Sequence, residues 1–323
     1  PKVLTIGLIV PVLKKTLLDT NSHQSYRPIT LSSTYAKVAE LLIHPDVDLS
    51  PSQFGFRPRR GTASACRLLN DIFHYYNNGK SPVYVCSLDA EKCFDRIWHS
   101  ALFFKLWGLL PIHQWLFLYV WYKNLKALVR WNGALSLDFQ VSRGTRQGSI
   151  LSPTLFNIFI NDLLVELSNN ASHGVRISGF SCNSMAYADD ISLISSSVPG
   201  LQALIDICIN YSRKWSFNFN ILKSNCMTVG KSPLRTSPEW YLDGNKLDNV
   251  DKLEILGCMF SCDNKVASHA DKREQKCRQS YFSLSEIGMC YPGLDSQTKC
   301  HLWNTVCSPC LMYGSDSLHY NDC

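Results

Sequence analysis

Ala186-Tyr187-Ala188-Asp189-Asp190-Ile191 sets two adjacent carboxylates inside an otherwise apolar stretch. Residues 184–194 around it alternate and are rich in small, aromatic and β-branched side chains, which predicts two short strands that meet at a tight turn. Adjacent carboxylates repel one another, so this turn needs cations close by. Taken alone, the stretch also fits a chance acidic pair on a surface turn.

A second acidic strand end lies upstream. Residues 83–89 (VYVCSLD) form a β-rich run that ends in Asp89, and residues 90–95 (AEKCFD) predict the opening of a helix. If the two strand ends lie side by side in one sheet, Asp89, Asp189 and Asp190 converge. Two Mg²⁺ ions roughly 3.5–4 Å apart, bridged by carboxylates and substrate phosphates, suit in-line phosphoryl transfer. One ion would activate an attacking hydroxyl, and the other would stabilise the leaving pyrophosphate.

These two segments resemble the metal-binding motifs A and C of reverse transcriptases. Asp89, Phe94 and Asp95 match the first motif, and residues 187–190 (YADD) match the second. The other motifs of the family follow in order along the chain. The two fingers motifs match residues 25–31 (SYRPITL) and 53–58 (QFGFRP), and motif B matches residues 143–148 (RGTRQG), 151–153 (LSP), 155–157 (LFN) and 160–163 (INDL). Motif D matches residues 219–224 (FNILKS), and the primer grip matches Leu256-Gly257. Together with residues 311–314 (LMYG), the pattern is most similar to the polymerases of non-LTR (LINE-type) retrotransposons.

The resemblance covers nearly the whole chain and implies an α/β (α+β) right-hand polymerase. The palm would be an antiparallel sheet packed on helices, with fingers and a helical thumb. We expect residues 1–82 to form the fingers and template-binding region, 83–260 the catalytic palm with inserted fingers elements, and 261–323 part of the thumb. The chain has no starting Met, so we expect it to be part of a longer reading frame. Such elements usually encode an endonuclease upstream and a nucleic-acid-binding segment downstream.

Composition narrows the class of protein. The 323 residues are 46% hydrophobic, which allows a sizeable core, while the net charge of +6 supports nucleic-acid binding only weakly. The longest apolar run, residues 115–122, is far shorter than the roughly 20 residues that span a bilayer, so we expect a core helix and no membrane association. The 14 cysteines and the lack of a signal peptide indicate reduced thiols. A zinc site between Cys300 and Cys310 is left open.

Local patterns predict several elements. Residues 6–12 are expected to form a strand, and residues 62–76 a helix with Thr62 as its cap. Tyr35, Val38 and Leu42 mark one face of a helix. Residues 127–141 predict a hairpin that turns at Asn132-Gly133, which is the strongest short hairpin signal. Strands near Met227 and over 255–260 are expected to complete the sheet.

The resemblance implies roles for the acidic residues and for one lysine. Asp89 and Asp189 would bind both ions, Asp190 would be a weaker or structural ligand, and the backbone carbonyl of Ala90 would also ligate metal. Lys223 would protonate the departing pyrophosphate, help that is worth ~10²–10⁴-fold in rate. For Asp89 alone the alternative is a helix N-cap, and for Lys223 it is a plain surface lysine. The cofactor is expected to be two Mg²⁺ ions, with Mn²⁺ as a substitute.

A second group of residues is expected to bind the incoming nucleotide. Phe94 would lie under its sugar and leave no room for a 2′-OH, although a core Phe at a helix start is the alternative. Arg27 and one of Lys14 or Lys15 would grip the triphosphate. Gln147 and Gly148 would lie against the sugar and the base pair, where Gly permits close approach of the backbone.

A third group would contact template or primer. Gln53, Phe54, Gly55 and Arg57 are expected to line the template path, with Arg57, Arg59 and Arg60 as a basic cluster for phosphates. Arg146 would contact phosphate or template, unless it forms a surface salt bridge. Tyr187 would pack behind the hairpin or near the primer end, and Leu256 with Gly257 would form the primer grip.

The resemblance therefore predicts an RNA-directed DNA polymerase, a nucleotidyltransferase. It would extend a primer 3′-OH with dNTPs on an RNA template during retrotransposition. Its partners would be the RNA template and the DNA primer or target, in a ribonucleoprotein found in the nucleus and cytoplasm. Two alternatives stay open: a group II intron-type or telomerase-like relative, and a non-catalytic RNA-binding remnant of a decayed element. Template choice, target site and oligomeric state are not predicted.

Overall fold

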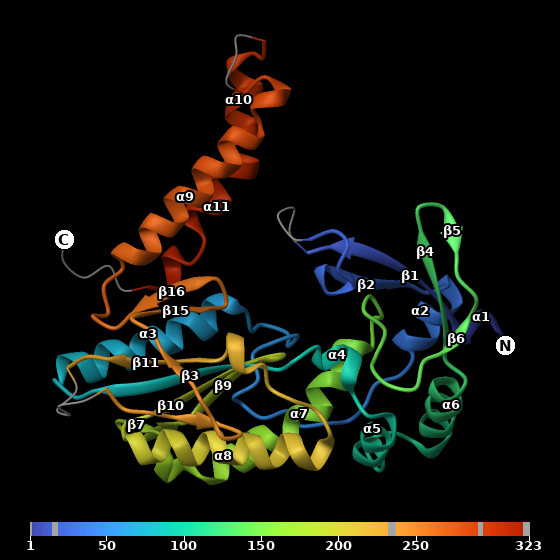
Figure 1. Ribbon diagram of the computed structural model, residues 1–323, viewed down its shortest axis with the longest axis horizontal. Coiled ribbons are helices and arrows are strands. Elements are labelled where there is room, and N and C mark those ends of the chain that lie inside the picture. The colour runs from blue at the N-terminus through green and yellow to red at the C-terminus, as the bar shows by residue number, and fades with distance from the viewer. Residues whose placement is uncertain (1, 15–18, 232–236, 290–292, 319–323) are drawn as a thin grey trace.

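The computed structural model describes residues 2–14, 19–231, 237–289 and 293–318. Two β-sheets lie toward opposite ends of the long axis, and a helical arm projects away from one of them (Figure 1). The central sheet has the strand order β14-β11-β3-β10-β9. Its strands are β3 (Val83–Asp89), β9 (Ser184–Tyr187), β10 (Asp190–Ser195), β11 (Asn225–Val229) and β14 (Asp248–Asn249).

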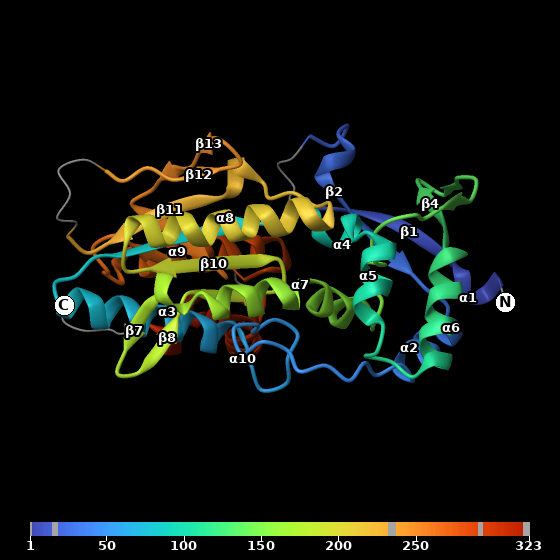
Figure 2. The same cartoon turned by 90° about the horizontal axis from the view of Figure 1, so that it is seen from below.

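Strand β3 is apolar along nearly its whole length because both faces of the central sheet are covered. Helices α7 (Ser152–Asn169) and α8 (Val198–Trp215) lie along one face, and α3 (Thr62–Asn78) packs on the other (Figure 2). Leu88 joins the buried cluster that contains residues of α7 and α8, whereas Val85 joins the cluster with Leu69 and Phe73 of α3. Successive side chains of a strand point to opposite faces, so one run of residues fills two cores.

The helix starts follow local capping rules only in part. Helix α8 begins after Ser197, whose hydroxyl accepts a hydrogen bond from the Gly200 amide at 3.1 Å, which satisfies one amide of the first turn. Helix α3 is capped by Gly61, without a side-chain bond, so the prediction that Thr62 is the cap is wrong. The short helix α4 (Cys93–Arg96) follows β3, and α5 (His99–Leu106) follows α4.

The second sheet, which we call the N-terminal sheet, combines two distant parts of the chain. It contains β1 (Ile6–Leu13), β2 (Tyr26–Leu31), β4 (Lys126–Trp131), β5 (Ala134–Leu135) and β6 (Phe139–Gln140). The predicted turn at Asn132-Gly133 is confirmed, since both residues have positive φ angles of 47° and 83°, as a type I′ turn requires. Helices α1 (Lys2–Thr5), α2 (Thr34–Leu41) and α6 (Ile112–Lys123) lie at this end of the molecule (Figure 1).

Helix α2 is present, and the face marked by Tyr35, Val38 and Leu42 is the one directed at solvent. Ala36 and Glu40 are buried instead. The Glu40 carboxylate accepts a hydrogen bond from the Ile150 amide at 2.8 Å, which links the helix to the loop before α7. Helical spacing shows which residues share a face, but it does not show which face a neighbour covers.

The C-terminal part starts with a hairpin that stands apart from the central sheet. Among the described residues, strands β15 (Lys252–Ile255) and β16 (Cys258–Ser261) form a two-stranded sheet of their own around Leu256-Gly257, so the expectation that they complete the central sheet is wrong. Helices α9 (Ala267–Ser283), α10 (Ser296–Leu302) and α11 (Ser308–Met312) form the projecting arm (Figure 1). Two further short strand pairs are β7 (Val175–Ile177) with β8 (Phe180–Cys182), and β12 (Tyr241–Leu242) with β13 (Asn245–Lys246).

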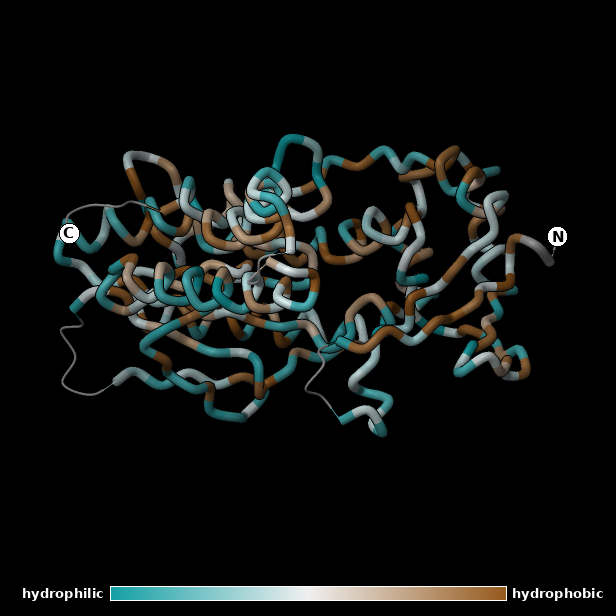
Figure 3. The backbone as a smooth tube through the Cα atoms, turned by 90° about the horizontal axis from the view of Figure 1, so that it is seen from above, coloured by the Kyte–Doolittle hydropathy of each residue, from teal (hydrophilic) through white to brown (hydrophobic). Residues whose placement is uncertain are grey.

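Apolar segments gather along the strands and the helices that cover them, and polar residues dominate many outer loops (Figure 3). Within the described ranges, no helix combines the length and the hydropathy that a bilayer crossing requires. The boundaries predicted at residues 82/83 and 260/261 stay predictions. Helix α3, from the first predicted region, packs on the central sheet, and β4 to β6, from the second, belong to the N-terminal sheet.

Candidate active site

Strand register brings the three predicted carboxylates to one end of the central sheet. Asp190, the first residue of β10, lies opposite Asp89, the last residue of β3. Asp190 also pairs with Tyr187 of β9, so Ala188 and Asp189 form a two-residue turn in which Ala188 has a φ angle of 56°. The expected convergence of the two acidic strand ends is therefore confirmed.

A buried segment, residues 52–55, supports this turn from behind. The Gln53 side chain is fully buried, and its Oε1 accepts hydrogen bonds from the amides of Gly55 at 2.9 Å and Ala188 at 3.1 Å. A Cβ on Gly55 would lie 2.4 Å from the Ala188 nitrogen, so only glycine fits there. Both residues were expected to line the template path. Gln53 has no exposed surface to do so and supports the acidic turn instead.

Crowding and burial shape the electrostatics of the carboxylates. Burial is the largest cause that raises the pKa of Asp189, and a hydrogen bond from the Cys93 thiol opposes it. Desolvation, followed by repulsion from Asp189 and Asp89, raises the pKa of Asp190 to about 6. The Lys223 ammonium lies 3.3 Å from Asp89 Oδ2 and partly balances the negative charge. The site thus needs more positive charge than the chain itself supplies.

The backbone around Asp89 explains how Lys223 reaches it. The Asn220 amide donates to the Asp89 carbonyl at 2.7 Å, and Ala90 forms a bridge with Phe219. These contacts dock residues 219–224, the predicted motif D, beside the end of β3. Lys223 therefore lies at the carboxylates, as expected, although its role in catalysis stays a prediction.

The donor set fits hard divalent cations, which prefer carboxylate and carbonyl oxygens. Within the described residues, however, no three His, Cys, Asp or Glu side chains are arranged to hold a metal ion by themselves. Asp89 contacts Lys223, and Asp189 accepts from Cys93. Further oxygen ligands, such as the Ala90 carbonyl or substrate phosphates, would have to complete a metal site.

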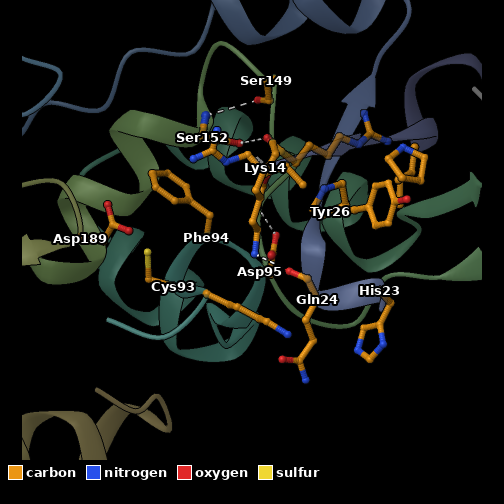
Figure 4. A pocket seen from close by; sticks show the side chains of 18 of the residues that line it. Lys14, His23, Gln24, Tyr26, Cys93, Phe94, Asp95, Ser149, Ser152 and Asp189 are labelled. Carbon is orange, nitrogen blue, oxygen red and sulfur yellow. Dashed lines mark hydrogen bonds between the residues drawn. The ribbon is translucent and has the colours of Figure 1, made fainter. Parts of the chain in front are cut away.

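Two of the three carboxylates, Asp89 and Asp189, line a cavity of about 1260 Å³ between the two sheets, whereas Asp190 is not part of its lining. Asp89, Asp189 and Phe94 line it from the central sheet and α4, and Lys14 and Arg27 line it from the N-terminal sheet. Figure 4 shows Phe94, Asp95, Asp189 and Lys14 around the same hollow. Opposite charges therefore meet across the cavity, as binding of a metal-complexed anion would require. Lys15, the other predicted triphosphate ligand, lies outside the described residues.

Phe94 is partly exposed to this cavity and is held from one side. Its ring stacks on Phe156 of α7, with centroids 4.7 Å apart and an interplanar angle of 30°. The neighbouring Cys93 side chain is buried, and burial raises the pKa of its thiol. Since Cys93 points toward Asp189 and Phe94 lines the cavity, the start of α4 places an aromatic side chain next to the carboxylates. Phe94 also lies at the start of α4 and packs against the buried core, so the alternative of a core Phe at a helix start stays open beside the role in the cavity wall.

The loop 144–148 is anchored to the same wall. Gln147 Nε2 donates to Asp95 Oδ1 at 2.8 Å, and the Thr145 amide donates to the Phe94 carbonyl at 2.7 Å. Gly148 has a φ angle of 109°, and a Cβ there would lie 3.0 Å from the Thr30 carbonyl oxygen. Gln147 and Gly148 both line the cavity, next to Phe94. Asp95 fixes the amide of Gln147, because a carboxylate can accept only from the Nε2 side.

Two arginines predicted to contact template bind backbone carbonyls, and their contacts with template stay predictions. Arg146 is buried, and its guanidinium donates to the carbonyls of Leu4 and Thr5 at 3.2 and 2.6 Å. The alternative of a surface salt bridge is wrong because Arg146 is buried, and the residue is part of the cavity lining. Arg57 donates to the carbonyls of Leu49 and Ser50 at 3.2 and 2.8 Å. Both guanidinium groups therefore hold loops in place.

The remaining template and primer predictions fall outside the cavity lining or at its edge. Phe54 packs against the cluster around α3, under the guanidinium of Arg60. Tyr187 lies in the acidic hairpin, 6.5 Å from the ring of Phe56. Leu256 and Gly257 form the β15–β16 turn, where the Tyr313 hydroxyl donates to the Leu256 carbonyl and Arg273 donates to the Gly257 carbonyl, both at 2.8 Å. In the described chain, this turn is not part of the cavity wall.

The Cys300–Cys310 segment gives no support for zinc. Cys300 is exposed, Cys307 is buried and Cys310 is half-buried, and no metal-binding group involves them in the described ranges.

Phe56 lines the cavity, although it was not among the site residues predicted from the sequence. Its position within residues 53–58 was the available signal.

Comparison with known proteins agrees with this geometry. The family "Reverse transcriptase (RNA-dependent DNA polymerase)" matches residues 12–260, and the chain belongs to this family. The "RNA-directed DNA polymerase from mobile element jockey" of Drosophila funebris is 25% identical over 329 residues, which cover 97% of this chain and 35% of that protein. The "Probable RNA-directed DNA polymerase from transposon BS" of Drosophila melanogaster is 28% identical over 281 residues, covering 81% of this chain and 30% of that protein.

The chain thus spans about a third of the length of these curated relatives. Among solved structures, the telomerase of Candida tropicalis in complex with a TWJ fragment of telomeric RNA has a TM-score of 0.58 at 13% identity, over 94% of this chain and 52% of that one. This likeness concerns the fold alone. The predicted right-hand polymerase fold and the resemblance to non-LTR retrotransposon polymerases are both confirmed.

Proposed function

We propose that this chain is the polymerase core of a non-LTR retrotransposon protein, and that it extends a primer 3′-OH with dNTPs on an RNA template. The observation that carries the proposal is the register of β3 and β10, which sets Asp89 opposite Asp190, beside a large cavity that Asp89 and Asp189 line. Opposite that acidic end, Lys14 and Arg27 offer positive charge for a triphosphate. The family supports an RNA template and a nucleic-acid primer as partners.

Asp89, Asp189, Asp190 and the Ala90 carbonyl would hold two Mg²⁺ ions. When bound, the ions supply Lewis acidity and charge neutralisation for in-line phosphoryl transfer. The chain's own residues do the remaining work. Lys223, 3.3 Å from Asp89, is positioned to donate a proton near the leaving group. Arg27, exposed on β2, binds phosphate oxygens with its planar fork.

Phe94 selects the sugar by steric exclusion. The stacked Phe156 prevents its ring from retreating into α7, so the ring keeps its place at the cavity wall. A ribose 2′-OH directed at that ring would find no room and no hydrogen-bond partner. Gln147, oriented by Asp95, contacts the nucleotide from the neighbouring wall.

Primer extension on poly-rA/oligo-dT with Mg²⁺ tests the proposal. Wild-type protein should extend the primer, and Asp189→Asn should lose about 10²–10³-fold or more in rate, since it weakens ligation of ions worth several kcal/mol. Asp271→Asn, at an exposed position on α9, is the matched control and should retain wild-type activity. RNA binding without extension by the wild type would contradict the proposal and support a binding remnant.

A further inference from the structure

Phe56 is an exposed aromatic residue in the candidate active site. Its side chain is 55% exposed, yet it lines the same cavity as Asp89, Phe94 and Asp189. Exposure alone does not single Phe56 out, since Phe104 and Phe282 are more exposed; what does is the position of its ring in the cavity beside the acidic residues.

The backbone of Phe56 is strained. Its φ angle is 55°, in the left-handed region that bulky residues rarely adopt and that glycine adopts freely. The flanking residues fix this conformation. The Gly55 carbonyl accepts a hydrogen bond from Asn157 at 3.0 Å, and the Arg57 side chain is bonded to the carbonyls of Leu49 and Ser50. A phenylalanine is thus held in a backbone conformation that glycine would adopt at lower energy, and such strain persists mainly at functional sites.

The ring of Phe56 contacts two residues of the site. It meets the Phe94 ring edge-to-face, with centroids 6.4 Å apart and planes at 88°, and it lies 6.5 Å from the Tyr187 ring. Phe156 stacks on Phe94 from another direction, at 4.7 Å and 30°. Phe94 is therefore held between one ring parallel to it and one ring perpendicular to it.

We propose that Phe56 is a positioning residue for sugar selection, which holds the Phe94 ring in the place where it excludes a 2′-OH. The inference rests on the proposed function, because it assumes that Phe94 is the sugar wall. Phe156 prevents the ring from moving into the core, and Phe56 prevents it from turning toward the open cavity. Without Phe56 the ring would gain a second orientation, and the 2′-OH of a ribonucleotide would find space.

Phe56→Gly separates this role from folding. Glycine accepts the φ angle of 55° without strain, so the midpoint of thermal unfolding should not fall. The ratio of kcat/KM for dTTP to that for UTP should nevertheless fall about three- to tenfold, the size expected for losing one aromatic pair. The fall should come from faster use of UTP, which no loss of stability can produce. Phe56→Trp should restore most of the ratio.

A double-mutant cycle tests whether Phe56 acts through Phe94. In a Phe94→Ala background, Phe56→Gly should change the ratio no further. Phe282→Ala, an exposed phenylalanine on α9 with its own edge-to-face partner Tyr281, is the matched control and should leave the ratio at its wild-type value.

Three results would overturn the inference. An unchanged ratio in Phe56→Gly, while Phe94→Ala lowers it, refutes the role of Phe56 and leaves the proposed function intact. An equal fall in the Phe94→Ala background shows that Phe56 acts independently of Phe94. A wild-type protein that extends no primer overturns the proposed function and the inference together.

Discussion

The Ala188 amide donates a hydrogen bond to Oε1 of Gln53, 135 residues away in the chain, at 3.1 Å. The same oxygen accepts from the Gly55 amide, so one buried side chain ties the acidic turn to the segment that carries Phe56. The geometry of the carboxylates and that of the aromatic wall therefore depend on a common support. This support explains why Gln53, which has no exposed surface, lies in residues 53–58, a segment that was expected to contact template.

Gln53→Leu removes this support at nearly constant volume. Two buried amides, those of Gly55 and Ala188, lose their acceptor, and each costs about 1–3 kcal/mol when left unsatisfied. We expect the free energy of unfolding to fall by that order and primer extension to fall with it. Urea denaturation measures the first effect. Gln279→Leu, at an exposed site on α9, is the control, and equal stability of both variants would contradict the assigned support.

Phe94→Ala is expected to admit ribonucleotides. Removing the ring opens the space beside the sugar, and loss of such a steric contact changes selectivity by about 10–200-fold. Competition between dTTP and UTP in primer extension measures the change. Phe104→Ala, an exposed phenylalanine on α5, should have no effect. Unchanged sugar discrimination in Phe94→Ala would refute the assignment of Phe94 as the sugar wall.

Burial of Asp190, together with repulsion from Asp189 and Asp89, predicts an unusual pH dependence of stability without divalent metal. The folded-state pKa of Asp190 is about 6, above the usual value near 4, so the folded state holds this proton more tightly than the unfolded state. The free energy of unfolding should therefore fall as pH rises from about 4 through 6, and the full loss is present above the folded-state pKa. Asp190→Asn removes it, and this variant should be more stable than the wild type at pH 8 but not at pH 4.

Urea unfolding in EDTA across this pH range measures that difference. Asp271→Asn, exposed on α9, should follow the wild-type curve. Added Mg²⁺ should raise the stability of the wild type more than that of Asp190→Asn, since a cation relieves the repulsion. A difference between Asp190→Asn and the wild type that is the same at every pH would argue against carboxylate crowding.

The β15–β16 turn is fixed by the C-terminal arm. The Tyr313 hydroxyl donates to the Leu256 carbonyl, and a Cβ on Gly257 would lie 3.2 Å from the Tyr313 ring. If this turn grips the primer, Tyr313→Phe should raise KM for primer–template severalfold while KM for dNTP stays the same. The lost hydrogen bond should lower stability by about 0.5–1.5 kcal/mol. Steady-state kinetics with each substrate varied in turn is the measurement, and Tyr35→Phe, on exposed α2, is the control.

Much of this arrangement could be predicted from local sequence. The apolar run before Asp89, the hairpin around residues 188–189 and the turn at Asn132-Gly133 all have short-range causes, and the structure contains each of them. The order of the motifs along the chain indicated the right-hand polymerase class, because the family resemblance implied how the main pieces assemble.

What the sequence could not show depends on distant partners. Arg146 was expected at phosphate or template, and the sequence did not show that its guanidinium binds the Thr5 carbonyl, 141 residues away in the chain. The pairing of β15 with β16 also depends on which strand edge is available, a non-local property. The positive φ angle of Phe56 could not be predicted from its residue type, since phenylalanine usually adopts a negative φ angle.

The most direct test of the central claim is single-turnover primer extension by Asp89→Asn, compared with the wild type in a titration of Mg²⁺. Asp89 lies opposite Asp190 across the paired strands, and the proposed metal site depends on Asp89 and Asp189 as ligands of both ions. We predict that the wild type extends the primer only with divalent metal, and that Asp89→Asn stays at background at every concentration. Extension by Asp89→Asn at the wild-type rate would contradict the claim that these carboxylates form one catalytic centre.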